Sequence, residues 1–98
     1  MSVLLATARY LYLGFDDAVN GAQLFRAAVA PTRLSDFKGR DGCSVGAAGC
    51  VGLGGAGFGA PARTRFLDAR ALAAGGQTTV YVAAGDASGP LQLFALPE

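Results

Sequence analysis

The sequence predicts an all-β fold made of antiparallel hairpins, with a glycine-rich loop inserted between them. Short runs of Tyr, Leu, Val and Phe alternate with turn-forming residues, which is typical of antiparallel sheets. The chain aligns with itself without a gap at an offset of 69 residues, which indicates that one unit occurs twice. Between the two copies lies a stretch in which glycine is the commonest residue and no periodicity is maintained.

The self-alignment matches residues 11–26 with residues 80–95. Each copy has a β-favouring run, a turn-rich stretch and a second β-favouring run, so we predict hairpins at 10–27 and 79–96. Asn20-Gly21 and Ser88-Gly89-Pro90 supply the backbone conformations that a chain reversal needs. The identical positions are Tyr12 and Tyr81, Asp17 and Asp86, Ala18 and Ala87, and the runs Gln23-Leu24-Phe25 and Gln92-Leu93-Phe94.

The segments between the copies differ in character. Residues 27–37 are expected to continue out of the first hairpin as an extended segment, with Pro31 at a strand end or a sheet edge. Residues 39–60 are rich in glycine and contain both cysteines, and we predict that they form an inserted loop.

Residues 61–76 leave two structures open. Pro61 near the start and Gly75-Gly76 past the end suit a helix. Alternation of Leu67, Ala69 and Ala71 with Asp68 and Arg70 suits a strand. The repeat favours the strand, because Gly75-Gly76 would then turn the chain into a further hairpin with residues 78–84.

Cys43 and Cys50 lie in the glycine-rich loop. The chain has no histidine, so the two thiols neither complete a zinc site nor have a neighbouring base to activate them. We predict a disulfide, which in the chain-entropy model stabilises by roughly 2.5 kcal/mol for so short a loop. A disulfide implies an oxidising, extracytoplasmic compartment, whereas two buried free thiols are the alternative.

The composition of this 98-residue chain argues against several classes of binding partner. It is 52% hydrophobic, with a net charge of +1 and scattered charges, which argues against disorder, nucleic-acid binding and a polybasic membrane patch. The apolar run at residues 1–8 is too short for a signal-peptide core. The uncharged stretch 42–62 is more than a third glycine, so we expect no membrane span.

Two motifs could indicate a binding site for a cofactor or a metal ion. Gly52, Gly54 and Gly57 match G-x-G-x-x-G, but neither a preceding strand nor a following helix start is evident, and we expect no cofactor. Weak candidate oxygen ligands for calcium are Asp16, Asp17, Asn20 and Asp86. Their spacing does not match an EF-hand loop, and turns use Asp and Asn in any case.

No catalytic residue is expected. Asp16 and Asp17 are neighbours on an extended chain and point to opposite faces, so they do not form a catalytic pair. Arg63 and Arg65 would share one strand face, which a solvated surface explains. Tyr10 and Tyr12 also share a face, where sheet packing is favoured over a stacking platform for a sugar or a base.

The first copy resembles the blade motif of bacterial secreted β-propeller repeats. It has a strand Leu11-Tyr12-Leu13-Gly14, an Asp/Asn-rich turn and a strand Gly21-Ala22-Gln23-Leu24-Phe25-Arg26. The second copy departs from this pattern at Ala83-Ala84 and at Ala95. Leaving out the 22 residues of the loop shortens the repeat spacing from 69 to 47, within the roughly 40–50 residues at which blades recur. The resemblance implies one to two propeller blades.

We expect residues 1–98 to be a single domain or a domain fragment with a non-enzymatic structural or binding role in a larger extracytoplasmic β-repeat protein. The alternatives are a fragment of a secreted propeller hydrolase, with catalytic residues on other blades, and a small self-associating β protein. Either the remainder of a larger chain or a homo-oligomer would be the partner, because the apolar runs carry almost no charged residues to protect sheet edges.

Overall fold

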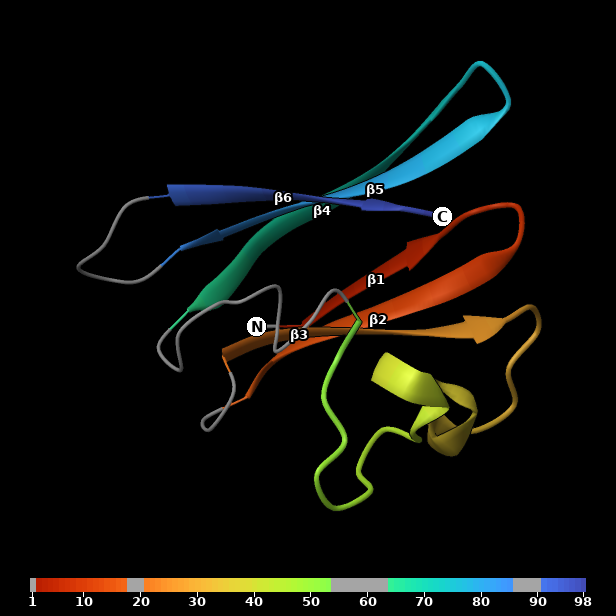
Figure 1. Ribbon diagram of the computed structural model, residues 1–98, viewed down its shortest axis with the longest axis vertical. Helices are drawn as coiled ribbons and strands as arrows, with labels where there is room; N and C mark the ends of the chain where they lie inside the picture. The colour runs from red at the N-terminus through yellow and green to blue at the C-terminus, as the bar shows by residue number, and fades with distance from the viewer. Residues whose placement is uncertain (1, 18–20, 54–63, 86–90) are drawn as a thin grey trace.

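The computed structural model describes residues 2–17, 21–53, 64–85 and 91–98, which contain two three-stranded antiparallel sheets (Figure 1). The first sheet contains β1 (Ser2–Ala6), β2 (Tyr10–Asp17) and β3 (Gly21–Ala28). The second contains β4 (Arg65–Ala74), β5 (Gln77–Gly85) and β6 (Leu91–Pro97). The prediction of an all-β fold built from hairpins is confirmed. These residues form no closed sheet and no α-helix, and the assignment to propeller blades stays a prediction.

The two hairpins have the same strand register. Leu13 pairs with Phe25 in the first hairpin, and Val82 pairs with Phe94 in the second. The offset of 69 found in the sequence carries one pair onto the other. Gly21, at the start of β3, has a φ of 80°, a conformation open to glycine without steric cost. The predicted turn residues 20 and 88–90 lie outside the described part of the chain.

Of the two structures left open for residues 61–76, the strand is the one observed, from Arg65 to Ala74. Gly75 and Gly76, with φ values of 60° and 78°, turn the chain into β5 as expected. The simple alternation expected along this strand is wrong, because the register shifts between Phe66 and Asp68. This bulge places Phe66 and Ala69 in the core although they are three residues apart.

The extended segment expected at residues 27–37 ends early. β3 stops at Ala28, and the chain forms the 3₁₀ turns η1 (Leu34–Asp36) and η2 (Arg40–Gly42). The Asp36 carboxylate accepts hydrogen bonds from the backbone N–H groups of Thr32 and Arg33, which favours a turn over a strand. Residues 29–53 therefore fold back over the first sheet, on the side away from the second sheet (Figure 1). We call this segment the cap loop.

The main core lies between the two sheets and draws side chains from both. Gly14 of β2 allows the Phe66 ring of β4 to approach closely, since a Cβ at this position would lie 2.8 Å from Phe66 Cζ. The Asp16 carboxylate accepts a 2.8 Å hydrogen bond from the Phe66 backbone N–H and thereby ties β4 to β2. The buried members are Tyr12, Ala22, Leu24, Phe66, Ala69, Val80, Val82 and Ala84.

A second apolar cluster lies between the first sheet and the cap loop. Phe25 and Phe37 are its largest buried members, and the Phe25 ring stacks on Phe15 at a centroid distance of 5.4 Å. The loop also hydrogen-bonds the outer edge of β3, where Lys38 N–H donates to Arg26 O at 2.7 Å. Leu53 N–H donates to Leu24 O on the same strand, so an otherwise unpaired edge is protected.

The predicted cysteine pair is seen in the cap loop. The Sγ atoms of Cys43 and Cys50 lie 2.14 Å apart, at disulfide distance, and their Cα atoms are 5.6 Å apart. Cys50 packs against the Phe25 cluster, so the disulfide contributes to the covering of the first sheet.

We predict that Gly14→Ala lowers the free energy of unfolding by roughly 1–3 kcal/mol, because the added methyl overpacks the core between Val3 and Phe66. Urea denaturation measures this change. In a Phe66→Leu background the same substitution should cost less, since the smaller side chain leaves room. An equal cost in both backgrounds would contradict close packing of Gly14 against Phe66.

Replacing Cys43 and Cys50 together by Ser should lower the unfolding free energy of the oxidised protein by roughly 2.5 kcal/mol, because the unfolded chain regains the freedom of the closed loop. Denaturation with and without dithiothreitol measures this difference, and the reductant should leave the double variant unchanged. Two free thiols in a non-reducing mass spectrum after oxidative refolding would refute the disulfide.

Candidate functional site

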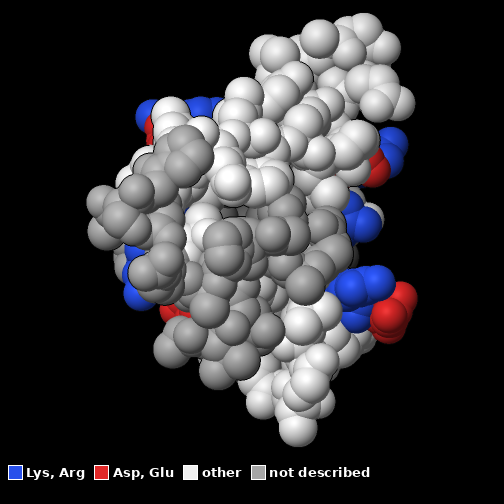
Figure 2. Space-filling view, turned by 60° about the vertical axis from the view of Figure 1, so that its left-hand side comes forward, with Lys and Arg blue, Asp and Glu red and all other residues white. Residues whose placement is uncertain are grey.

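Charge does not mark out a binding site on the surface shown in Figure 2. Lys and Arg side chains appear there in small separate groups, several beside Asp or Glu, with no broad field of one sign. Exposed apolar side chains are a stronger feature of this protein. Leu93, Leu91 and Leu4 have exposed fractions of 71%, 68% and 67%.

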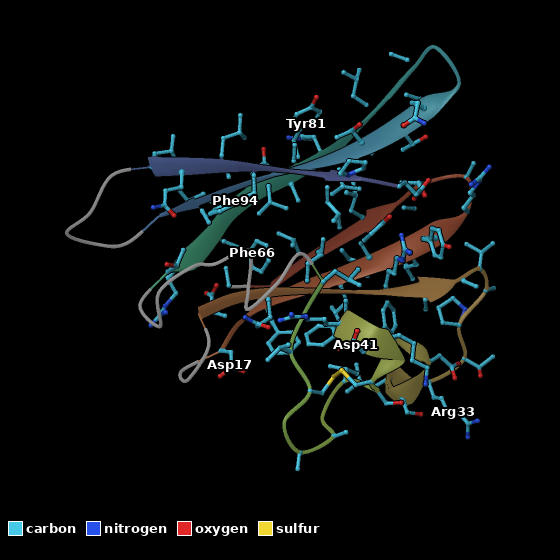
Figure 3. The ribbon with its side chains drawn as sticks, in the orientation of Figure 1. Asp17, Arg33, Asp41, Phe66, Tyr81 and Phe94 are labelled. Carbon is cyan, nitrogen blue, oxygen red and sulfur yellow. A yellow bond between two sulfur atoms is a disulfide. The ribbon has the colours of Figure 1, made fainter. Side chains whose placement is uncertain are left out.

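Two of these leucines lie on one face of the second sheet. Along β5, Val80, Val82 and Ala84 are buried against the first sheet, so the alternate residues point the other way. Figure 3 shows Tyr81 on that outer side and Phe94 on the side of the first sheet.

We call this outer side the open face. Antiparallel partners share a face, so Leu93 opposite Ala83 and Ala95 opposite Tyr81 extend it across β6. Asp68 and Arg70 of β4 lie on the same face, opposite Ala83 and Tyr81, and form an exposed ion pair with an N···O distance of 3.2 Å. Its apolar members are Leu72, Tyr81, Ala83, Leu91, Leu93 and Ala95.

The open face corresponds, at the offset of 69, to the face of the first sheet that is buried in the core. Tyr81 corresponds to Tyr12 and Leu93 to Leu24, and both residues of the first sheet are fully buried. In the first sheet this face is therefore covered by the second sheet, whereas no described residue covers its counterpart.

The sheets thus pack with unlike faces together. Val82 and Phe94 of the second sheet face the core, but their counterparts in the first sheet, Leu13 and Phe25, lie under the cap loop. One end of this two-sheet stack is capped and the other is open. The apolar runs of the sequence favoured self-association, but they could not show which face stays open, because that depends on how the sheets pack together.

The calcium candidates are only partly described. Asp16 is engaged by the Phe66 N–H, and its Oδ2 lies 4.0 Å from Arg65 Nε. Asp17 follows on the other face of β2, and residues 20 and 86 lie outside the described ranges. Within those ranges no three His, Cys, Asp or Glu side chains are close enough to hold a metal ion.

The other motifs take part in packing where they are described. Gly52 N–H donates to Gln23 Oε1 at 2.5 Å, and a Cβ at Gly52 would lie 2.7 Å from Leu24 N. The glycine at 52 therefore allows the cap loop to reach β3, and residues 54 and 57 lie outside the description. Arg65 is exposed and residue 63 is not described. Tyr10 and Tyr12 pack in the main core, as favoured from the sequence.

A cavity of about 340 Å³ lies where the cap loop meets the first sheet. The stacked rings of Phe15 and Phe25 and the Asp17 side chain line it, and this combination suits an apolar or a cationic group. The remaining lining residues are Gly46, Ala47, Gly49 and Cys50. The sequence could not reveal this cavity, because its walls come from segments that only the folded loop brings together.

A polar cluster links the two sheets near their ends. Glu98 Oε1 accepts hydrogen bonds from Tyr12 Oη at 2.8 Å and from Thr7 Oγ1 at 2.6 Å. Arg26 lies over the Tyr10 ring, with its Cζ 4.1 Å from the ring centroid. Burial raises the pKa of Tyr12, a hydrogen bond with Arg26 opposes this rise, and Glu98 adds to it.

We predict from the pKa of Tyr12 that the protein loses stability in alkali. Because its folded-state pKa lies above the usual value of 10.0, the phenol ionises first in the unfolded state. The free energy of unfolding should therefore fall as the pH rises above about 10, and the fall should end once the pH exceeds the folded-state pKa of Tyr12.

Tyr12→Phe should reduce this fall in denaturation series between about pH 8 and 11, whereas Tyr81→Phe on the open face should leave the contribution of Tyr12 in place. A pH profile unchanged by Tyr12→Phe would contradict the assignment.

Within the described residues no helix is long and apolar enough to span a membrane. No protein-family model matches the chain, and no curated protein or solved structure matches it.

Proposed function

We propose that this chain is a non-enzymatic structural or binding module that receives a further β-sheet on its open face, within a larger β-repeat assembly. The observation that carries the proposal is the relation between the two sheets. The open face has the strand position and register of the face that the first sheet buries against the second, and Tyr81 and Leu93 stand where that face has Tyr12 and Leu24.

The apolar character of the open face supports this role. Leu91 and Leu93 stand side by side on one strand face, with about 70% of each exposed. Contiguous apolar patches on protein surfaces mark interaction sites more often than isolated exposed residues do. When one face of a sheet is covered and the other is apolar and in water, a second layer that covers the apolar face stabilises the assembly.

The asymmetry of the stack supports a terminal position in such an assembly. Repeat arrays need a capping element at their ends, and the cap loop covers the outer face of the first sheet in this way. The cysteine pair in that loop is compatible with an extracytoplasmic location. The resemblance of residues 11–26 to a propeller blade agrees with sheets that stack through unlike faces.

The proposal predicts that Leu93→Lys suppresses association of the chain, because a charge in the centre of the open face cannot be desolvated cheaply. Light scattering coupled to size exclusion, over a dilution series from about 100 μM to 1 μM, measures the association. Binding of a fluorescent hydrophobic dye reports the exposed patch.

Leu34→Lys is the matched control, since Leu34 is 61% exposed but lies in the cap loop. It should leave association unchanged. At concentrations low enough for the wild type to be dissociated, Leu93→Lys should also change the free energy of unfolding by less than about 0.5 kcal/mol, because the side chain is outside the core. A wild-type monomer at every concentration, with dye binding unaffected by Leu93→Lys, would overturn the proposed function.

A further inference from the structure

We infer that the occupant of the open face is a second copy of this chain, with the two open faces packed against each other about a two-fold axis. The inference rests on the proposed function and names the partner for the same surface. Three features of the described residues lead to it: the cap over the opposite end, the shape of the open face and the arrangement of its charges.

The cap loop covers the other apolar face over β2 and β3, and only Leu4 of β1, opposite Leu13, is strongly exposed there among the described residues. Inside the molecule, the buried face of the first sheet is covered by the face that carries Val82 and Phe94. In a head-to-tail contact, the open face of one copy would pack against the first sheet of the next copy, on the face that carries Leu13 and Phe25. The cap loop covers this part of the face, and Phe25 is only 2% exposed. A head-to-tail contact would have to break the hydrogen bonds between the loop and β3. The open face of another copy is already accessible.

The open face is also shaped differently from its counterpart in the first sheet. Gly14 provides the space into which Phe66 inserts, but the corresponding residue of the second sheet is Ala83. Its methyl group would block a ring that approached in the same way. Ala95 replaces Arg26, and Leu91 replaces Ala22, so the surface over β5 and β6 is apolar and, apart from Tyr81, aliphatic. Such a surface suits the layer-on-layer packing of two sheets.

The charges on the open face are self-complementary. Asp68 and Arg70 are adjacent, oppositely charged and exposed, and they lie beside the apolar rows of β5 and β6. A two-fold axis that crosses this face can place Asp68 of each copy beside Arg70 of the other, so that both ion pairs re-form between the copies. An isologous interface uses one patch on both subunits and closes at two copies.

Charge reversal tests this arrangement. Asp68→Lys leaves two positive charges on the face and Arg70→Glu leaves two negative charges, so each variant alone should dimerise at least about tenfold more weakly than wild type. An equimolar mixture of the two variants should form heterodimers with close to wild-type affinity. Analytical ultracentrifugation with one variant labelled separates heterodimers from homodimers.

Ala48→Lys and Arg40→Glu, both at exposed positions of the cap loop, are the matched charge controls and should dimerise as wild type does. Unfolding curves of all variants verify that the fold is retained. Open-ended oligomers, or a mixture that gains nothing over the separate variants, would overturn the two-fold interface. If Leu93→Lys still abolished association in that case, the open face would remain a docking surface and the proposed function would stand.

Discussion

Each sheet of this protein has two apolar faces, and the rest of the structure follows from the need to cover them. In an antiparallel sheet with one solvated face, apolar and polar residues alternate along each strand. The strands of this protein are so rich in Leu, Val, Phe, Tyr and Ala that neither face is mainly polar. Packing the two sheets together covers one face of each. The cap loop covers the third face over β2 and β3 but leaves Leu4 of β1 exposed, and the fourth face stays open. The two ends of the stack therefore differ, since one outer face is covered by the cap loop and the other is open.

The cap loop can cover a sheet because its composition permits close approach. Gly52 brings the loop backbone against Leu24, Gly39 lies where a Cβ would meet the backbone of Val51, and Phe37 supplies an apolar side chain to the sheet face. The cysteine pair closes the outermost part of the loop. A segment that the sequence presents as an insertion therefore has a structural task, which is to bury Phe25 and to pair the edge of β3.

Polar contacts between the sheets fix how they stack. At one end the Asp16 carboxylate holds the backbone of Phe66, and at the other Glu98 accepts hydrogen bonds from Thr7 and Tyr12. Because these groups belong to different sheets, a slide of one sheet over the other would break both contacts. Hydrogen bonding of the buried Tyr12 hydroxyl also avoids the cost of an unsatisfied polar group in the core.

The sequence by itself determined the features that depend on neighbouring residues, above all the two hairpins, whose runs and turns are local. It favoured a disulfide between Cys43 and Cys50 over two buried free thiols, because no histidine is present to complete a zinc site or to activate a thiol. It left residues 61–76 open between helix and strand, and the choice was decided by pairing with β5, a tertiary interaction. Only the tertiary structure decided that Leu24 is buried whereas Leu93 is exposed, although both occupy the same place in the repeat. Local chemistry is the same at these two positions, and the difference comes entirely from which face meets another layer.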